Sequence, residues 1–172
     1  MKKGAATDVP VVWSSELGRV CPGCGKAAAM CGCSKKGVRP GGDGNVTATH
    51  MAWHTPRRGG RDCPSPIVVG KFIIVCDMGG IATCYDAADG QIYWKERMNG
   101  KFSGSPIAAN GLVYFVNEEG TTIVIKPGPM LEVVAENKLA SGKVEIFRAS
   151  PTPSTGQFLL RSTSVLYCIG KN

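Results

Sequence analysis

The chain has 172 residues, 43% of them apolar, which is the composition of an ordinary globular protein that can bury a core. No run reaches the 18 consecutive apolar residues that a membrane-spanning helix needs, so we expect no membrane span. The net charge of +7 is uneven, because residues 1–62 hold ten Lys or Arg against four acids and residues 63–172 hold ten against nine. The sequence therefore begins with a basic leader.

The basic leader has two interpretations. Its positive charge can attract phosphate, so RNA is a candidate partner, whereas a solvated flexible arm is the alternative. Met1–Lys3 resembles the charged start of a signal peptide, but residues 4–10 are not an apolar run. We therefore expect no export signal and a cytoplasmic location.

Four cysteines crowd into thirteen residues of this leader, namely Cys21, Cys24, Cys31 and Cys33. Such a cluster in a chain without an export signal favours a metal site over a disulfide framework. A zinc ion takes four thiolates in a tetrahedron at about 2.3 Å, and a closed four-thiolate site is structural rather than catalytic. We predict structural zinc here, with unmetallated or disulfide-linked thiols as the alternative.

Residues 34–45 combine glycine, proline and charge, which predicts a linker between a leader over residues 1–44 and a second domain over residues 45–172. The second domain opens with an alternating segment, residues 46–53, which predicts a strand. His50 and His54 would then stand about 13 Å apart, too far to share one metal ion.

Two later stretches, Ser65–Gly80 and Ser105–Gly120, align without a gap at a spacing of 40 residues, and a looser copy begins at Ser150. Each copy holds a compact apolar run bounded by Gly, Asp or Asn, which indicates short strands and all-β structure. Self-similarity at this period predicts stacked sheets, because one small sheet cannot bury its own apolar face.

Alignment of the copies predicts the roles of several side chains. Cys84 falls opposite Val124 and Cys168, so we interpret both thiols as inert apolar filler, and Cys76 likewise. Gly80 and Gly90 stand where hairpin turns need a positive φ. Trp94, and Trp53 before it, should each present a large apolar face to an adjacent repeat.

The segment from Asp86 to Trp94 reads Asp-x-x-x-Gly-x-x-x-Trp and resembles the repeat of the PQQ-like, quinoprotein-type β-propeller family. The resemblance covers residues 45–172 and implies an all-β partial β-propeller of about three blades. From the cysteine spacing and charge of residues 1–44, we expect this propeller to carry a basic, mostly irregular zinc-knuckle leader. Some members of that family bind the quinone PQQ and oxidise alcohols or sugars, whereas others are cofactor-free scaffolds. This sequence has no adjacent Cys-Cys pair and little chain to enclose a cofactor, so we do not expect PQQ.

Residues 9–44 show a second resemblance. The segments Val12–Gly25, Cys31–Cys33 and Gly42–Gly44 are similar to the start of bacterial relatives of eukaryotic translation initiation factor one. That resemblance implies contact with RNA or the ribosome through the leader.

The first hypothesis is a non-enzymatic β-propeller repeat module that acts as a binding protein or scaffold. Propellers close with four to eight blades, so a chain with about three is a fragment, self-associates, or adds its open edge to a partner. The alternatives are a translation-factor-like RNA binder and, third, a fragment of a PQQ-dependent dehydrogenase. Two charged clusters, Glu118–Glu119 and Arg57, Arg58 and Arg61, are expected on loops, either as contact surfaces or as solvated groups.

The zinc prediction is tested by native mass spectrometry of the full chain. One zinc ion per chain is expected, and Cys24→Ser should lose it, because three thiolates hold zinc less tightly than four. The matched control Cys84→Ser should keep the metal. A metal-free wild-type chain would contradict the prediction.

Overall fold

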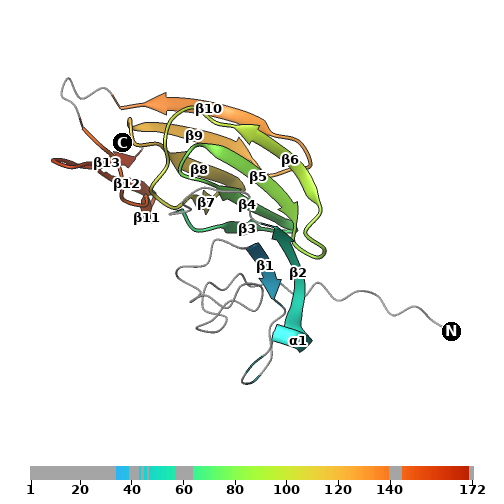
Figure 1. Ribbon diagram of the computed structural model, residues 1–172. Coiled ribbons are helices and arrows are strands. Elements are labelled where there is room, and N and C mark those ends of the chain that lie inside the picture. Colours follow the sequence, from blue (N-terminus) through green and yellow to red (C-terminus); the bar gives the residue numbers. More distant parts are fainter. Residues whose placement is uncertain are drawn as a thin grey trace. The chain divides into compact units, whose positions relative to one another are not determined.

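The computed structural model (Figure 1) describes residues 34–38, 43, 45, 47–56, 64–139 and 145–170. Residue contacts divide the chain into two compact units, one formed by Met1–Gly59 with Ala87–Gly90 and the other by Gly60–Asp86 with Gln91–Asn172. Almost every element is a strand and every pairing is antiparallel. The all-β prediction is confirmed.

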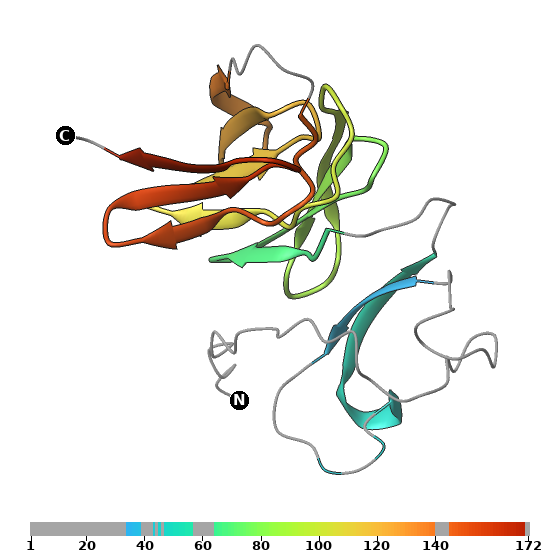
Figure 2. The same cartoon turned by 90° about the vertical axis from the view of Figure 1, so that its left-hand side faces the viewer.

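The second unit contains three sheets in sequence, each following one of the three repeat starts. The first sheet has the order β3 (Ile67–Val69), β4 (Phe72–Cys76), β5 (Ile81–Asp86) and β6 (Ile92–Arg97). The second has β7 (Ile107–Ala109), β8 (Leu112–Val116), β9 (Thr121–Lys126) and β10 (Glu132–Lys138). The third has β11 (Thr152–Ser154), β12 (Gln157–Arg161) and β13 (Leu166–Gly170), and Figure 2 shows it in red.

In each sheet the hairpin between the second and third strands is closed by one polar side chain at the same position. Asp77 Oδ1 accepts a hydrogen bond from the Ile81 N–H at 2.9 Å, and Asn117 Oδ1 accepts one from the Thr121 N–H at 2.7 Å. In the third sheet Ser162 Oγ accepts from the Val165 N–H at 2.9 Å. Short polar side chains suit this position because they satisfy a backbone donor within the turn.

Serine hydroxyls connect the successive repeat starts. The Ser65 N–H donates to Ser105 Oγ, and the Ser105 N–H donates to Ser150 Oγ, both at 2.9 Å. The Ser-Pro pairs that mark the repeats in the sequence therefore lie beside one another in the fold.

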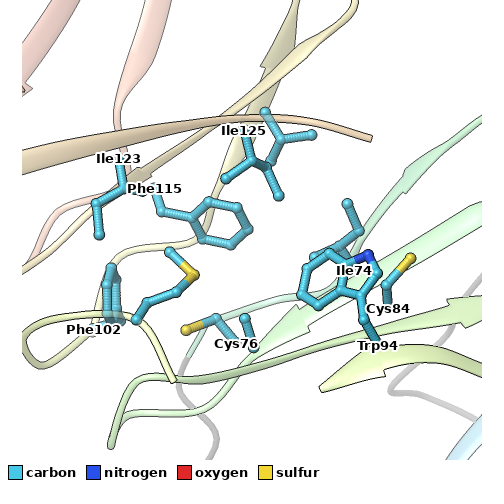
Figure 3. Close-up of a cluster of buried hydrophobic side chains, with 11 residues drawn as sticks. Ile74, Cys76, Cys84, Trp94, Phe102, Phe115, Ile123 and Ile125 are labelled. Carbon is cyan, nitrogen blue, oxygen red and sulfur yellow. The ribbon is translucent and has the colours of Figure 1, made fainter. Parts of the chain in front are cut away.

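Apolar side chains fill the space between the first two sheets. Figure 3 shows Ile74, Cys76, Cys84 and Trp94 of the first sheet together with Phe115, Ile123 and Ile125 of the second. Cys76 and Cys84 are fully buried, which confirms their predicted role as apolar filler. Each sheet supplies the apolar cover that the other lacks.

The prediction for Cys168 is wrong, because this thiol is exposed. It pairs with Leu159 as Cys84 pairs with Ile74, so the alignment of the repeats holds. Cys84 is buried and Cys168 is exposed because, in the described part of the chain, no further sheet packs against the face of the third sheet that carries Cys168.

The first unit contains β1 (Ser34–Val38), a single helical turn α1 (Thr47–His50) and β2 (Met51–Pro56). The prediction of a linker over residues 34–45 is therefore wrong for Ser34–Val38, which pair with β2 across the predicted boundary at residue 44. The prediction of a strand over residues 46–53 is wrong for Thr47–His50. His50 closes the helical turn and only His54 lies on the strand.

Strands β1 and β2 pair in the same register as β5 and β6, the last two strands of the first sheet. Trp53 pairs with Gly37 next to a one-residue bulge, as Trp94 pairs with Cys84 next to the bulge between β5 and β6. A bulge bends and twists a strand at a fixed place, so its recurrence marks equivalent positions. We conclude that the repeat pattern begins before Ser65.

Aromatic rings cover the turn glycines, and this contact predicts a large effect at Gly120. The φ of Gly120 is +81°, and an added Cβ would lie 2.7 Å from Cε2 of the buried Phe147. Gly120→Ala should lower the free energy of unfolding by about 2–4 kcal/mol in urea denaturation, through backbone strain and overpacking.

The matched control is Gly111→Ala. Gly111 has a similar φ of +74°, but nothing lies within 4 Å of its added Cβ. It should cost only the backbone strain, about 1–2 kcal/mol. Equal losses for both variants would show that the packing of Phe147 on Gly120 contributes nothing.

Candidate functional site

Two tryptophans in equivalent positions dock on backbone carbonyls. The Trp94 indole N–H donates to the Gly128 carbonyl at 3.0 Å, and within the first unit the Trp53 indole N–H donates to the Ala87 carbonyl at 2.9 Å. Donor and acceptor are 34 residues apart in both cases. The prediction that Trp94 presents its apolar face to the next repeat is confirmed, because the ring packs with Val113 and Phe115 of the second sheet. Trp53 repeats the hydrogen bond within the first unit.

The second sheet has no tryptophan at this position. Ala135 pairs with Val124 beside the bulge of β10, as Trp94 pairs with Cys84 beside the bulge of β6. Directly opposed residues on antiparallel strands lie on one face of a sheet. Ala135 therefore stands on the face whose counterpart in the first sheet carries the indole.

A cavity of about 680 Å³ lies between this face and the third sheet. Its apolar walls come from Tyr114, Val124 and Leu139 on one side and from Phe158 and Ile169 on the other. The rings of Tyr114 and Phe158 approach to 5.5 Å between centroids. Volumes of 300 to 1,000 Å³ are typical of ligand sites, and such sites are mostly apolar.

Exposed apolar side chains form a second feature, on the outer part of the second sheet. We call Met130, Val133 and Val134 the β10 patch; their exposed fractions are 76%, 46% and 51%. Strand β10 is the last in the sheet order, so its outer edge presents backbone hydrogen-bonding groups. Apolar side chains on an open strand edge are typical of protein contact surfaces.

The acidic side chains near the turns are engaged in contacts within the fold. Glu118 accepts a hydrogen bond from Ser103 Oγ at 2.5 Å and lies 3.6 Å from the guanidinium of Arg148. Glu145 is buried and accepts from Ser164 Oγ at 2.8 Å and from the Tyr167 hydroxyl. Of the predicted acidic pair, only Glu119 is exposed on the turn.

The other predicted sites fall largely outside the described residues. Cys21, Cys24, Cys31 and Cys33 lie there, as do Arg57, Arg58 and Arg61. Zinc binding therefore stays a prediction. Within the described part of the chain, no three His, Cys, Asp or Glu side chains gather to hold a metal ion. No helix in that same part is long and apolar enough to cross a membrane.

Two groups have altered acidity. Burial, with a smaller contribution from the charge of Asp86, raises the pKa of the Cys84 thiol to about 11. The Tyr93 hydroxyl donates to Asp86 Oδ2 at 2.6 Å, and this hydrogen bond raises the pKa of Tyr93. Both groups stay protonated near neutral pH, which makes them poor nucleophiles or bases.

Sequence reasoning missed the cavity and the β10 patch. One signal was present, since the second repeat carries alanine where the first carries tryptophan. Ala135 can be matched to Trp94 only when the bulges in β6 and β10 are known, and the strand pairing shows where these bulges lie.

Comparison with known proteins identifies the family of this chain. Residues 10–127 match the model of a family described as outer membrane protein assembly factor BamB. A search of the curated proteins found no match.

Solved structures share the fold at low sequence identity. BamB from Moraxella catarrhalis is 16% identical, with a TM-score of 0.58 over 80% of this chain and 46% of that one. Dihydro-heme d1 dehydrogenase NirN, in complex with DHE, is 13% identical, with a TM-score of 0.60 over 81% of this chain and 30% of that one. Quinohemoprotein alcohol dehydrogenase from Comamonas testosteroni is 15% identical, with a TM-score of 0.51 over 60% and 17%. The chain thus spans less than half the length of each.

The raised pKa of Cys84 predicts very slow alkylation. At pH 8 its thiolate fraction should be about a hundredfold below that of an ordinary cysteine, because burial disfavours the charged form. Iodoacetamide labelling of the native chain, followed by peptide mapping, should modify Cys168 and leave Cys84 unmodified. Raising the pH toward 11 should increase labelling at Cys84, whereas equal rates at pH 8 would contradict its burial.

Proposed function

We propose that this chain, which belongs to the family of the outer membrane protein assembly factor BamB, is a non-enzymatic β-propeller module that binds a protein partner. The family name describes an assembly factor, and the tandem sheets supply a rigid platform of the kind on which binding sites are built. The partner contacts the chain through a loop and an open strand edge.

The β10 patch carries this proposal. Met130 is 76% exposed in the turn before β10, and Val133 and Val134 follow on the edge strand. An extended partner segment can add to an open edge through backbone hydrogen bonds, while its side chains contact the exposed valines. Figure 1 shows β10 at the outside of its sheet.

The use of polar groups in the described residues supports a binding role over catalysis. Asp77, Asn117 and Ser162 close turns, and Ser105 and Ser150 connect repeats. The acidic groups of Glu118 and Glu145 are likewise engaged by hydroxyls of the fold. These side chains hold the sheets in place, which leaves apolar surface for recognition.

Two other functions make distinct predictions. Two of the structural relatives are dehydrogenases, so a quinone-dependent fragment would reduce a dye when given PQQ, calcium and an alcohol. An RNA-binding leader would give salt-sensitive RNA affinity that disappears on deletion of residues 1–44. Neither behaviour is expected of a protein-binding module whose contact surface is the β10 patch.

Site-specific photo-crosslinking in the source organism tests the proposal. A benzophenone amino acid at Val134 of the full chain should give a discrete protein adduct, because that side chain lies in the contact surface. The same group at Lys95, an exposed position on the outer strand of the first sheet, is the matched control. The double change Met130→Ser with Val134→Ser should weaken partner recovery about tenfold.

The outcome that contradicts the proposal is equally specific. Adducts of equal yield at Val134 and Lys95, or unchanged recovery with the double variant, would remove the β10 patch as the contact surface.

A further inference from the structure

We infer that the cavity between the second and third sheets binds the side chain of a tryptophan carried by a partner protein segment. This inference rests on the proposed protein-binding function and names the chemistry of one contact. It concerns a different surface from the β10 patch, so each can be tested without the other.

The chain itself shows what the equivalent space accommodates. Between the first and second sheets that space holds the Trp94 indole, 7% exposed, whose N–H donates to a backbone carbonyl. Trp53 makes the same donation in the first unit. Gly90 permits this second contact, since an added Cβ there would lie 2.5 Å from the Trp53 ring. The repeat therefore has a recurring place for an indole.

The second sheet keeps the cross-strand row of this place but lacks the indole, and the turn that would follow β13, equivalent to the one that holds Gly128, lies outside the described residues. Tyr114 pairs with Val124, which in turn pairs with Ala135, and this row matches Ile74, Cys84 and Trp94 in the first sheet. Tyr114 and Val124 both line the cavity. Ala135 itself does not line the cavity, but its cross-strand partner Val124 does. Because the methyl group of alanine is much smaller than an indole, it leaves the space above Val124 open to an external ring.

The shape and polarity of the cavity favour an aromatic ring attached to a peptide. Tyr114 and Phe158 supply aromatic surface within the cavity, and Val124 is nearly fully buried. Asn110, Asn137 and Gln157, which carry side-chain amides, are also among its lining residues. Amides can donate to and accept from a peptide backbone, so they match a segment that extends from the ring.

Charge adds a restriction. Among the described residues that line the cavity, Lys138 is the one charged side chain. Its positive charge disfavours a cationic group such as arginine or lysine. A neutral indole with its single N–H donor is compatible with these surroundings.

Binding of short blocked peptides to the full chain tests the inference. The probe is Gly-Gly-Trp-Gly-Gly with 5-fluorotryptophan, followed by fluorine NMR, and the comparison peptide is Gly-Gly-Leu-Gly-Gly, used as a competitor. The tryptophan peptide should bind about tenfold more tightly than the leucine peptide, because a buried indole contributes more contact area.

A matched pair of variants locates the site. Ala135→Trp places an indole beside Val124, which lines the cavity, and should weaken peptide binding about tenfold or more, as one ring excludes another. Glu136→Trp introduces the same side chain one residue later, on the opposite face of β10, and should leave affinity within about twofold. Ala135→Trp should also raise the melting temperature, which shows that the variant is folded.

Several results would overturn the inference. These are equal affinity for the two peptides, equal loss in both variants, or binding of free indole as tight as that of the peptide. Partner crosslinking at Val134 would be untouched by any of them, so failure here is distinguishable from failure of the proposed function.

Discussion

The contact between one sheet and the next determines this structure. A four-stranded sheet of short strands has two faces and too little chain to cover either, so it is stable only against a neighbour. Here the cover comes from large side chains placed at equivalent positions, an indole that docks on the following turn and a phenyl ring over the preceding turn glycine. The burial of Ile74, Cys84 and Phe115 follows from that apposition.

The same constraint explains where polar groups go. Backbone donors occur in each of these hairpin turns and at the repeat starts, and short polar side chains satisfy them. Aspartate, asparagine and serine do this at one position in three sheets, so the chemistry of the side chain matters less than its reach. Side chains are left for contact with other molecules where no neighbouring sheet covers them, namely on the outer strand β10 and on the third sheet. Those places are the natural candidates for recognition.

The two interfaces of the second unit differ through a few residues. The first is filled around Trp94, and the second is open above Tyr114 and Val124, with alanine at the matching position. The bulge beside Trp53, Trp94 and Ala135 keeps that register while the side chain varies. A change in one side chain can thus convert a structural contact into a site, without a change of fold.

The sequence by itself determined the repeat, the all-β class, the turn glycines, the burial of Cys76 and Cys84 and the packing of Trp94 against the next repeat, because all of these follow from local pattern and from alignment of the copies. The four-cysteine zinc site also comes from local spacing and stays a prediction. Tertiary structure alone decided that Ser34–Val38 form a strand, that Cys168 is exposed, and that a cavity lies beside Tyr114. Each of these depends on which distant segment lies opposite, and a periodic sequence specifies the face of a strand but not what covers it.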